Sequence, residues 1–506
     1  MIYEFTTKLI AKTIGLFAPG YARKYLQEHM ICRMYEAAKN NGANSRFRPQ
    51  HSTGAQEIHD SWQNVTNKIR ALDRDNSHVA GMRRRFVAGL VGEGSWPRPK
   101  ILKNNAINRY DYDTKLNIDI LERWELWAKE ACANGDSVYQ LQRLAANHFF
   151  IDGGLLIRRV IINGQLRLEP IEFDQLDRDK DCDDGRIRIV DGKELDEFNK
   201  VKAYWIKPRH PAEVESDSRR ISAEEVIDLF DRERASSVSG ISRLACSTMN
   251  FYNIGMYRAD TMKLARVSTG YGVFIQSPYP EDYISDNPQT DENGNIYEYI
   301  IPGGVHYLRP GETMNQAKPE NPGTNYAPFL KAELQSASVG AGMSYESVSN
   351  DGSNTNFSGA RQMLLFERAM IRYTFAIFDE RFYSKMYEWF IEHEVYFNDL
   401  KMPDYENKKA HYLRASWSRP KTEWVDPLKD ANAARTEIDM GANTLTEFCE
   451  TAGRDIEEVV ATRKYEMDLF KKAGLIIEES EANNGNNTGY NDQQEELANA
   501  EANNKI

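Results

Sequence analysis

One short stretch of the chain concentrates polar side chains that could contact a ligand. Residues Ser349–Asn356 carry hydroxyl and amide groups and one carboxylate, from Asp351, and none of them is aliphatic. Helical patterns flank this stretch on both sides. A bare polar loop between two strong helices is unusual unless the loop has a use, so we expect a functional contact here. The alternative is a disordered surface connection between the two helices.

Two other clusters could bind a ligand. Asp174–Gly185 is rich in aspartate, but an EF-hand alignment on Gly185 places Lys180 and Cys182 at ligand positions, so we interpret it as a solvated acidic loop rather than a calcium site. Arg83–Arg85 is a basic triplet. It indicates either a solvated helix face or a contact with nucleic acid or another subunit.

Sequence motifs of catalysis are absent. The chain contains no G-x-x-x-x-G-K-[ST], no G-x-S-x-G and no H-E-x-x-H pattern. The glycines at Gly92, Gly94, Gly303 and Gly304 indicate turns. We expect none of the nine histidines to pair with a carboxylate one helical turn away. The sequence therefore predicts no catalytic residue, no metal site and no cofactor.

Composition and charge describe a folded protein of several modules. The chain has 506 residues, 41% of them hydrophobic, with 26 Tyr, 21 Phe and 8 Trp. A net charge of −12 argues against a broad basic face that grips nucleic acid, although nucleic acid could still slide past the protein. The cysteines are scattered, which favours reduced thiols over disulfides or zinc: Cys32, Cys132, Cys182, Cys246 and Cys449.

No apolar run approaches the roughly 20 residues of a membrane span. Leu9–Pro19 is interrupted by Lys12 and has no small-residue cleavage site, so we do not interpret it as a signal peptide.

Periodicity divides the N-terminal half into helices followed by strands. Helical patterns cover 21–38, 55–95 and 113–148. Gly154–Val160 and Leu166–Pro170 alternate like antiparallel strands, and Asn163-Gly164 between them is a hairpin signal. Val201–Ile206 is a further predicted strand.

The C-terminal half alternates long helices with a small β-rich insert. We predict a helix over Ser239–Val267, short strands within 270–325, and a helix over Phe329–Met343. Ser358 is the expected N-cap of a long amphipathic helix that ends at Phe397. Leu428–Gly474 contains three helical patterns, broken at Gly441 and Gly453. From Leu475 the chain is rich in Asn and Glu and is predicted to be disordered.

Several of these segments together resemble the lambda family of tailed-phage portal proteins, from about Tyr21 to Gly474. Single motifs are weak, but their order and spacing are specific. The matching residues are Trp124 and Trp127, Asp152-Gly153, Ile221–Phe230 followed by Gly240–Leu244, Leu308–Glu312, Gly342–Ser349, and Phe357–Arg361.

The resemblance implies an α+β portal fold with long stem helices, a small β-rich clip, an α/β wing and a helical C-terminal crown. The implied boundaries are 1–238 for the wing, 239–269 for the first stem helix, 270–326 for the clip, 327–343 for the second stem helix, 344–357 for the tunnel loop, 358–425 for the wing spine helix and link, 426–475 for the crown, and 476–506 for the tail.

The resemblance also implies a function without enzymatic activity. Family members form a ring, expected to be dodecameric, at one capsid vertex of the virion. Double-stranded DNA is packaged through the ring by the terminase and is later ejected. Further implied partners are the major capsid and scaffold proteins and a head–tail adaptor, with assembly in the host cytoplasm and no membrane contact.

Two sets of site residues follow from the resemblance. The DNA-facing tunnel loop is assigned to Ser349, Asn350, Asp351, Ser353, Asn354, Thr355 and Asn356, and the clip that contacts the motor or adaptor to Tyr279, Tyr283, Asn293, Tyr297 and Tyr299. Two alternatives remain open: a metal-dependent nuclease of the packaging machinery, and a monomeric or membrane-associated scaffold.

Overall fold

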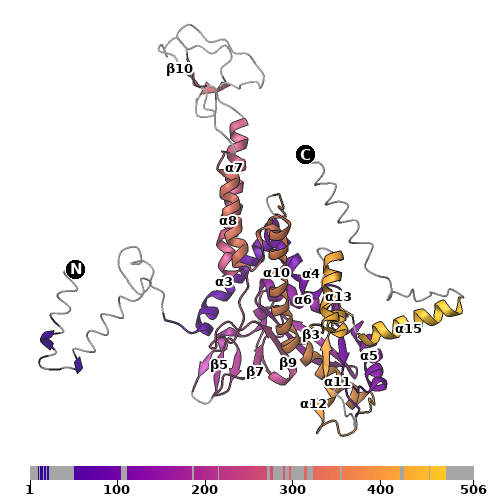
Figure 1. Ribbon diagram of the computed structural model, residues 1–506. Coiled ribbons are helices and arrows are strands. Elements are labelled where there is room, and N and C mark those ends of the chain that lie inside the picture. Colours follow the sequence, from indigo (N-terminus) through magenta and orange to yellow (C-terminus); the bar gives the residue numbers. More distant parts are fainter. Residues whose placement is uncertain are drawn as a thin grey trace, which may run out of the picture. The chain divides into compact units, whose positions relative to one another are not determined.

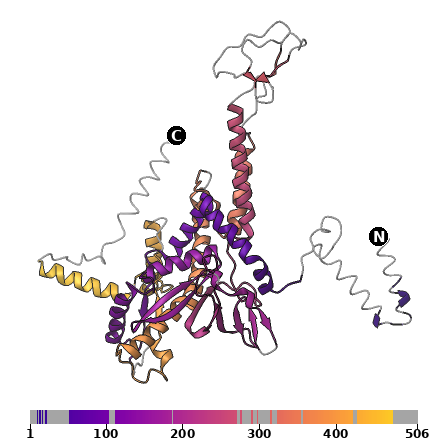
Figure 2. The same cartoon turned by 180° about the vertical axis from the view of Figure 1, so that it is seen from behind.

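The structure, a computed structural model, describes residues 51–103, 111–184, 187–214, 216–269, 323–353, 356–421, 427–454 and 456–473, and short pieces before residue 22 and between 274 and 315. The chain forms two compact units. One comprises Met1–Ser61 and Arg232–Val238, and the other comprises Trp62–Asp231 and Ser239–Ile506. Figures 1 and 2 show the chain from two opposite sides.

Helices and short strands alternate along the described residues. The helices are α3 (Gly54–Asp75), α4 (Ser77–Val91), α5 (Thr114–Ala128), α6 (Val138–Ile151), α7 (Thr248–Thr269), α8 (Tyr326–Gly340), α9 (Tyr345–Ser349), α10 (Phe357–Phe378), α11 (Ser384–Phe397), α12 (Lys409–Tyr412), α13 (Pro427–Asp439), α14 (Leu445–Thr451) and α15 (Ile456–Lys472). The strands are β1 (Pro97–Pro99), β2 (Gly154–Ile162), β3 (Gln165–Ile171), β4 (Cys182–Asp183), β5 (Arg188–Val190), β6 (Lys193–Leu195), β7 (Val201–Ile206), β8 (Arg219–Ser222), β9 (Val226–Phe230), β10 (Phe274–Gln276), β11 (Gln289–Thr290), β12 (Ile296–Tyr297), β13 (Thr313–Asn315) and β14 (Ala415–Trp417). This mixture confirms the expected α+β class.

Antiparallel pairing organises the strands. One sheet has the order β3-β2-β9 and another the order β4-β5-β6-β7-β8. The predicted hairpin is confirmed: Ile162 pairs with Gln165, and Asn163 and Gly164 between them have φ values of 53° and 76°. Positive φ at both central residues gives a turn whose twist matches that of the strands, which explains the Asn-Gly pair.

Aromatic side chains fill the core of the larger unit. Trp124 of α5 is fully buried and its ring centroid lies 5.0 Å from that of Phe390 on α11 and 5.7 Å from that of Trp417 on β14. Phe149 of α6 packs edge-on against Phe378 at the end of α10. A fully buried side chain of this size stabilises the fold by about 1.5–3 kcal/mol. These contacts fix α10 and α11 against α5 and α6.

The smaller unit contains the first turns of α3 and the segment Arg232–Val238. The Arg234 guanidinium lies 2.6 Å from a carboxylate oxygen of Glu57, and the amide of Gly54 donates to the Ser236 hydroxyl at 2.9 Å. These contacts join two segments that are far apart in the sequence.

Helices α7 and α8 form an antiparallel pair (Figure 1). The Ser247 hydroxyl donates to the Ala337 carbonyl oxygen at 2.9 Å near one end of the pair. Toward the other end, the Tyr257 ring lies 5.6 Å from Tyr326 and 5.1 Å from Phe329. The chain therefore enters this pair along α7 and returns along α8 toward α9.

The long helix expected over 358–397 consists of α10 and α11 joined by a π-helical segment, Asp379–Tyr383. The π segment has no signal in the sequence pattern, and it buries Phe382 and Tyr383 in the core. π segments occur mostly as single turns inside α-helices, as here. The three predicted C-terminal helices are confirmed as α13, α14 and α15.

The predicted helix over Ser239–Val267 is wrong for its first nine residues, because α7 begins only at Thr248. A Cβ atom on Gly240 would lie 2.1 Å from the carbonyl oxygen of Gly153. The backbone around Gly240 therefore passes directly against the turn before β2, an approach that only glycine allows. The Ser242 hydroxyl also donates to the carbonyl oxygen of Phe150 in this region, at 2.9 Å.

Candidate functional site

The segment predicted as the tunnel loop, 344–357, begins with a short helix that was not predicted from the sequence. Helix α8 ends at Gly340, not at Met343, and α9 covers Tyr345–Ser349. Ser344 is the N-cap of α9, and its hydroxyl oxygen accepts a hydrogen bond from the amide of Ser347 at 3.2 Å. A serine before a single helical turn is a favourable cap, so local chemistry explains the helix.

The described residues after α9 form hydrogen bonds mainly with one another and with α9. Asn350 has φ 61° and ends α9, with its amide donating to the Glu346 carbonyl oxygen. The Asp351 carboxylate accepts hydrogen bonds from the amide and hydroxyl of Ser353 at 3.0 and 2.6 Å, and from the Tyr345 hydroxyl at 3.2 Å. These hydrogen bonds, those from Ser353 foremost, lower the pKa of Asp351, so it is ionised at neutral pH.

The loop ends at a cap that differs from the predicted one. Asn356, not Ser358, is the N-cap of α10, and its side-chain oxygen accepts from the amide of Gly359 at 2.7 Å. Asparagine caps helices as well as serine does, so sequence alone does not choose between the two. The structure thus brings Ser349, Asn350, Asp351 and Ser353 together, whereas Asn354 and Thr355 lie outside the described residues.

Three elements hold α9 and the start of the loop. From α10, Glu367 accepts hydrogen bonds from Ser344 and Ser347. From α4, Arg85 donates to the Asn350 side-chain oxygen at 2.7 Å, and the His78 ring lies 3.3 Å from the Val348 carbonyl oxygen. From α8, the Lys331 ammonium lies 5.1 Å from the centre of the Tyr345 ring.

The sequence analysis missed Glu367 and its role. It lies 23 residues after Ser344, and no local pattern connects the two positions. The basic triplet divides in the structure: Arg83 pairs with Asp73 at 2.8 Å, whereas Arg85 is exposed and contacts the loop. The triplet alone contains no signal that distinguishes these two arginines.

The predicted clip residues are mostly outside the described part of the chain. This applies to Tyr279, Tyr283, Asn293 and Tyr299. Tyr297 belongs to β12 and pairs through its backbone with Gln289 of β11.

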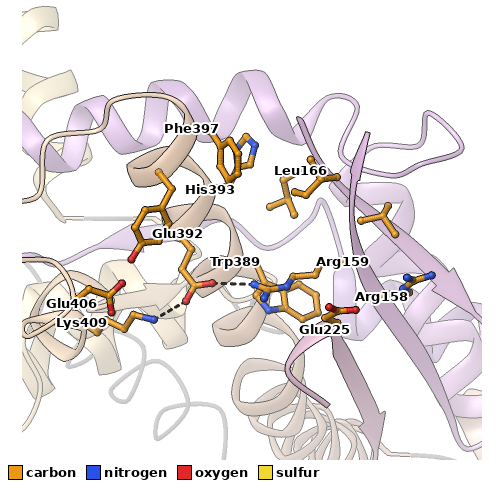
Figure 3. A pocket seen from close by; sticks show the side chains of 13 residues that line it. Arg158, Arg159, Leu166, Glu225, Trp389, Glu392, His393, Phe397, Glu406 and Lys409 are labelled. Carbon is orange, nitrogen blue, oxygen red and sulfur yellow. Dashed lines mark hydrogen bonds and ion pairs between the residues drawn. The ribbon is translucent and has the colours of Figure 1, made fainter. Parts of the chain in front are cut away.

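A cavity of about 710 Å³ lies between the β2–β3 hairpin and helices α11 and α12 (Figure 3). Glu392 lies at its centre and pairs with Arg159 at 3.0 Å and with Lys409 at 2.7 Å. Nε2 of His393 donates a hydrogen bond to the Gly164 carbonyl oxygen, and the His393 ring stacks on Phe397. None of the described lining residues is Ser, Thr or Cys, and the central charges pair with one another. The central carboxylate of the cavity is thus held in ion pairs on two sides.

One group of described residues has the composition of a metal site. Side-chain atoms of Glu172, Asp174 and His210 lie within 4.8 Å of one another. Arg70 already supplies a cation there, at 3.3 Å from Glu172 and 2.7 Å from Asp174. The interpretation of Asp174 as part of a solvated loop is therefore wrong, because its side chain is only 6% exposed and is held in an ion pair.

One expectation about histidine is also wrong. His148 and Asp152 are four residues apart on α6, and Nδ1 of His148 contacts the Asp152 carboxylate. Arg70 binds the other carboxylate oxygen at 2.8 Å. Burial alone would raise the pKa of Asp152, but the hydrogen bonds from His148 and Arg70 lower it below its ordinary value. Trp62 donates to the Asp152 carbonyl oxygen at 3.0 Å, so the cluster ties α3 to the end of α6.

Two further properties concern the described chain as a whole. Cys132, Cys182, Cys246 and Cys449 are free thiols. Among the helices that the structure describes, none has both the length and the apolar character needed to cross a membrane.

Comparison with known proteins identifies the family. Residues 40–374, more than half of the chain, match the family described as "Phage portal protein, lambda family". The "Probable portal protein" of Halomonas phage phiHAP-1 is 24% identical over 481 residues, which cover 89% of each chain. Portal protein B of Escherichia phage lambda is 24% identical over 178 residues, 34% of this chain and 33% of that protein.

Among solved structures, a chain from the neck of an empty gene transfer agent (GTA) particle is 10% identical, with a TM-score of 0.44. The alignment covers 78% of the present chain and 94% of the neck chain. The family match over residues 40–374 agrees with the resemblance read from the sequence motifs. The chain therefore belongs to the lambda family of phage portal proteins.

Proposed function

We propose that this protein is the subunit of a ring-shaped portal channel at one vertex of the phage capsid, the connector between head and tail. Double-stranded DNA would be packaged through the ring by the terminase and ejected through it later. The observation that carries the proposal is the path of the chain. The antiparallel pair of α7 and α8 leads into α9 and a polar loop, and this loop is braced on the long helix α10.

The chemistry of the loop suits a surface along which DNA slides. Each phosphate neutralised by a protein cation adds salt-dependent affinity, so a translocation channel works best with few cations in contact with the backbone. Ser349, Asn350, Ser353 and Asn356 are neutral. Asp351 is ionised, because Ser353 lowers its pKa, and it repels phosphate. Two cations lie near the described part of the loop: Arg85 donates to the Asn350 side chain, and Lys331 lies against the Tyr345 ring.

An exposed apolar stripe on α7 supports ring formation. Met249, Tyr252 and Met256 follow one another at helical spacing and are each between 44% and 53% exposed. An apolar groove of about 550 Å³ lies beside them, lined also by Leu72 of α3. Contiguous exposed apolar surface of this kind marks protein interfaces, and in a closed ring the partner is another copy of the chain.

Further parts of the proposal rest on the family. We propose a dodecameric ring in the virion, with assembly in the host cytoplasm, and contacts with the large terminase, the major capsid and scaffold proteins and a head–tail adaptor. Residues around Tyr279–Tyr299 are proposed to contact the motor and adaptor. We propose no enzymatic activity and no cofactor. The nuclease alternative gains no support from the Glu172, Asp174 and His210 group, because Arg70 is paired there.

Removal of the loop tests the proposed function. Deletion of Asn350–Asn356 is expected to leave ring assembly intact and to reduce the number of DNA-filled heads in a packaging reaction. A matched control replaces the same seven residues with a Gly/Ser linker of equal length, which retains the polar backbone but removes Asp351. If rings that lack the loop package and retain DNA as well as the unmodified protein does, the loop has no functional contact with DNA.

A further inference from the structure

Helix α9 depends on its neighbours for its position. It has five residues, a little more than one turn, and isolated helices of this length are not stable in water. Of its residues only Val348 is buried. The orientation of α9, and of the loop that leaves it at Asn350, is therefore set by the side chains that bind it from other elements.

Glu367 of α10 makes the most extensive of these contacts. One carboxylate oxygen accepts from the Ser344 amide at 2.8 Å and from the Ser344 hydroxyl at 2.7 Å. The other oxygen accepts from the Ser347 hydroxyl at 2.9 Å. Three short hydrogen bonds meet on one half-buried carboxyl group, and together they fix both the position and the rotation of the helix.

The contacts from α4 are weaker by comparison. Arg85 bonds to a neutral amide oxygen in an exposed position, and His78 faces one carbonyl oxygen at 3.3 Å. Lys331 contributes only a contact with the Tyr345 ring. Glu367 is thus the main connection between α9 and the long helix that continues through the π segment into α11.

We infer that Glu367 is the positioning residue of the proposed DNA-facing loop: it clamps the start of α9 to α10, so that the loop keeps a fixed place relative to the long helix. This inference rests on the proposed function for its consequence in packaging, but the clamp itself can be tested without DNA. Glu367 does not touch DNA in this account and acts only through α9.

Amide hydrogen exchange of assembled rings tests the clamp. In Glu367→Ala, exchange at residues 345–349 is expected to be at least about tenfold faster, because the local opening of α9 loses its main restraint. Ser347→Ala removes only one of the three bonds and is expected to give a smaller increase. Glu380→Ala changes an exposed glutamate on the same long helix and is the control, with no expected change at 345–349. Unchanged exchange in Glu367→Ala, with rings formed, would overturn the inference.

A double-mutant cycle then connects the clamp to packaging. Glu367→Ala is expected to reduce packaging, and Glu367→Gln, which keeps the side-chain shape and one carbonyl acceptor, to reduce it less. In the ring that lacks Asn350–Asn356, adding Glu367→Ala is expected to change packaging by no more than about twofold, the scatter of additive sites. A larger additional loss would show that Glu367 acts elsewhere. Where loop deletion impairs packaging, normal packaging by Glu367→Ala would also contradict the inference.

Failure of the proposed contact between loop and DNA and failure of the Glu367 clamp give different results. If loop-deleted rings package normally while Glu367→Ala still speeds exchange at 345–349, the proposed contact of the loop with DNA is wrong and the clamp remains. If loop deletion impairs packaging while Glu367→Ala alters neither exchange nor packaging, the loop has its function and Glu367 does not position it.

Discussion

Asp152 is a single residue that connects two helices, α3 and α6. Its carboxylate binds Arg70 of α3 and His148 of α6, and its side chain is only 3% exposed. Removal of a buried carboxylate is strongly destabilising when it leaves a basic partner without compensation. We expect Asp152→Ala to lower the free energy of unfolding by about 3 kcal/mol, the lower end of the range for buried pairs, because Arg70 retains Asp174.

The cluster also predicts how stability depends on pH. Because the pKa of Asp152 is lowered on folding, the ionised group stabilises the protein above its ordinary pKa, and this contribution is lost as pH falls through the lowered value. Urea unfolding followed by Trp fluorescence, at fixed protein concentration, should therefore show a shallower loss of stability between about pH 5 and pH 2 in Asp152→Asn than in the unmodified protein.

Asp119→Asn is the matched control for both measurements. Its carboxylate is 45% exposed and pairs with Arg123, so its removal is expected to cost less than about 1 kcal/mol. If substitution of Asp152 and substitution of Asp119 lower the free energy of unfolding equally, the role assigned to Asp152 is wrong.

At the scale of elements, the exposed apolar face of α7 is the proposed contact between subunits. A glutamate at Met256 would carry a charge into the proposed apolar interface between copies. We expect Met256→Glu to weaken each interface by about 2–5 kcal/mol and to yield monomers instead of rings, with helix content unchanged. Mass photometry measures the oligomeric state, and circular dichroism measures the helix content.

Leu126→Glu makes the same chemical change at a residue of α5 that is 70% exposed, and it is expected to leave assembly unchanged. If Met256→Glu assembles as well as Leu126→Glu, the α7 face is not the interface between subunits.

Sequence patterns predicted the elements whose signals are local. The Asn163-Gly164 hairpin, the pair α5 and α6, and the long helix from 358 to 397 follow from turn chemistry and periodicity. Errors arose where a distant segment decides the local structure. The segment after Ser239 is not helical because it meets Gly153, which is 87 residues earlier in the sequence than Gly240. No window of sequence around Ser239 contains that information.

In the candidate site, too, local features were predicted and contacts from distant segments were not. The polar composition of Ser349–Asn356 located the loop, but helix α9 was not predicted. The side chains that hold the loop, Glu367 and Arg85, come from α10 and α4, and their contacts depend on packing between helices. Periodicity predicts that these helices exist but not which of their residues face α9.

At the scale of the whole molecule, we propose that copies of this chain form a ring around a channel for DNA. Exposed apolar surface on α7 and the family match over residues 40–374 support it. Electron microscopy of the purified full-length protein, with particles classified in two dimensions, tests it most directly. The account predicts rings with a central hole. Compact particles without a hole, or a persistent monomer at every protein concentration and salt condition used for packaging, would contradict it.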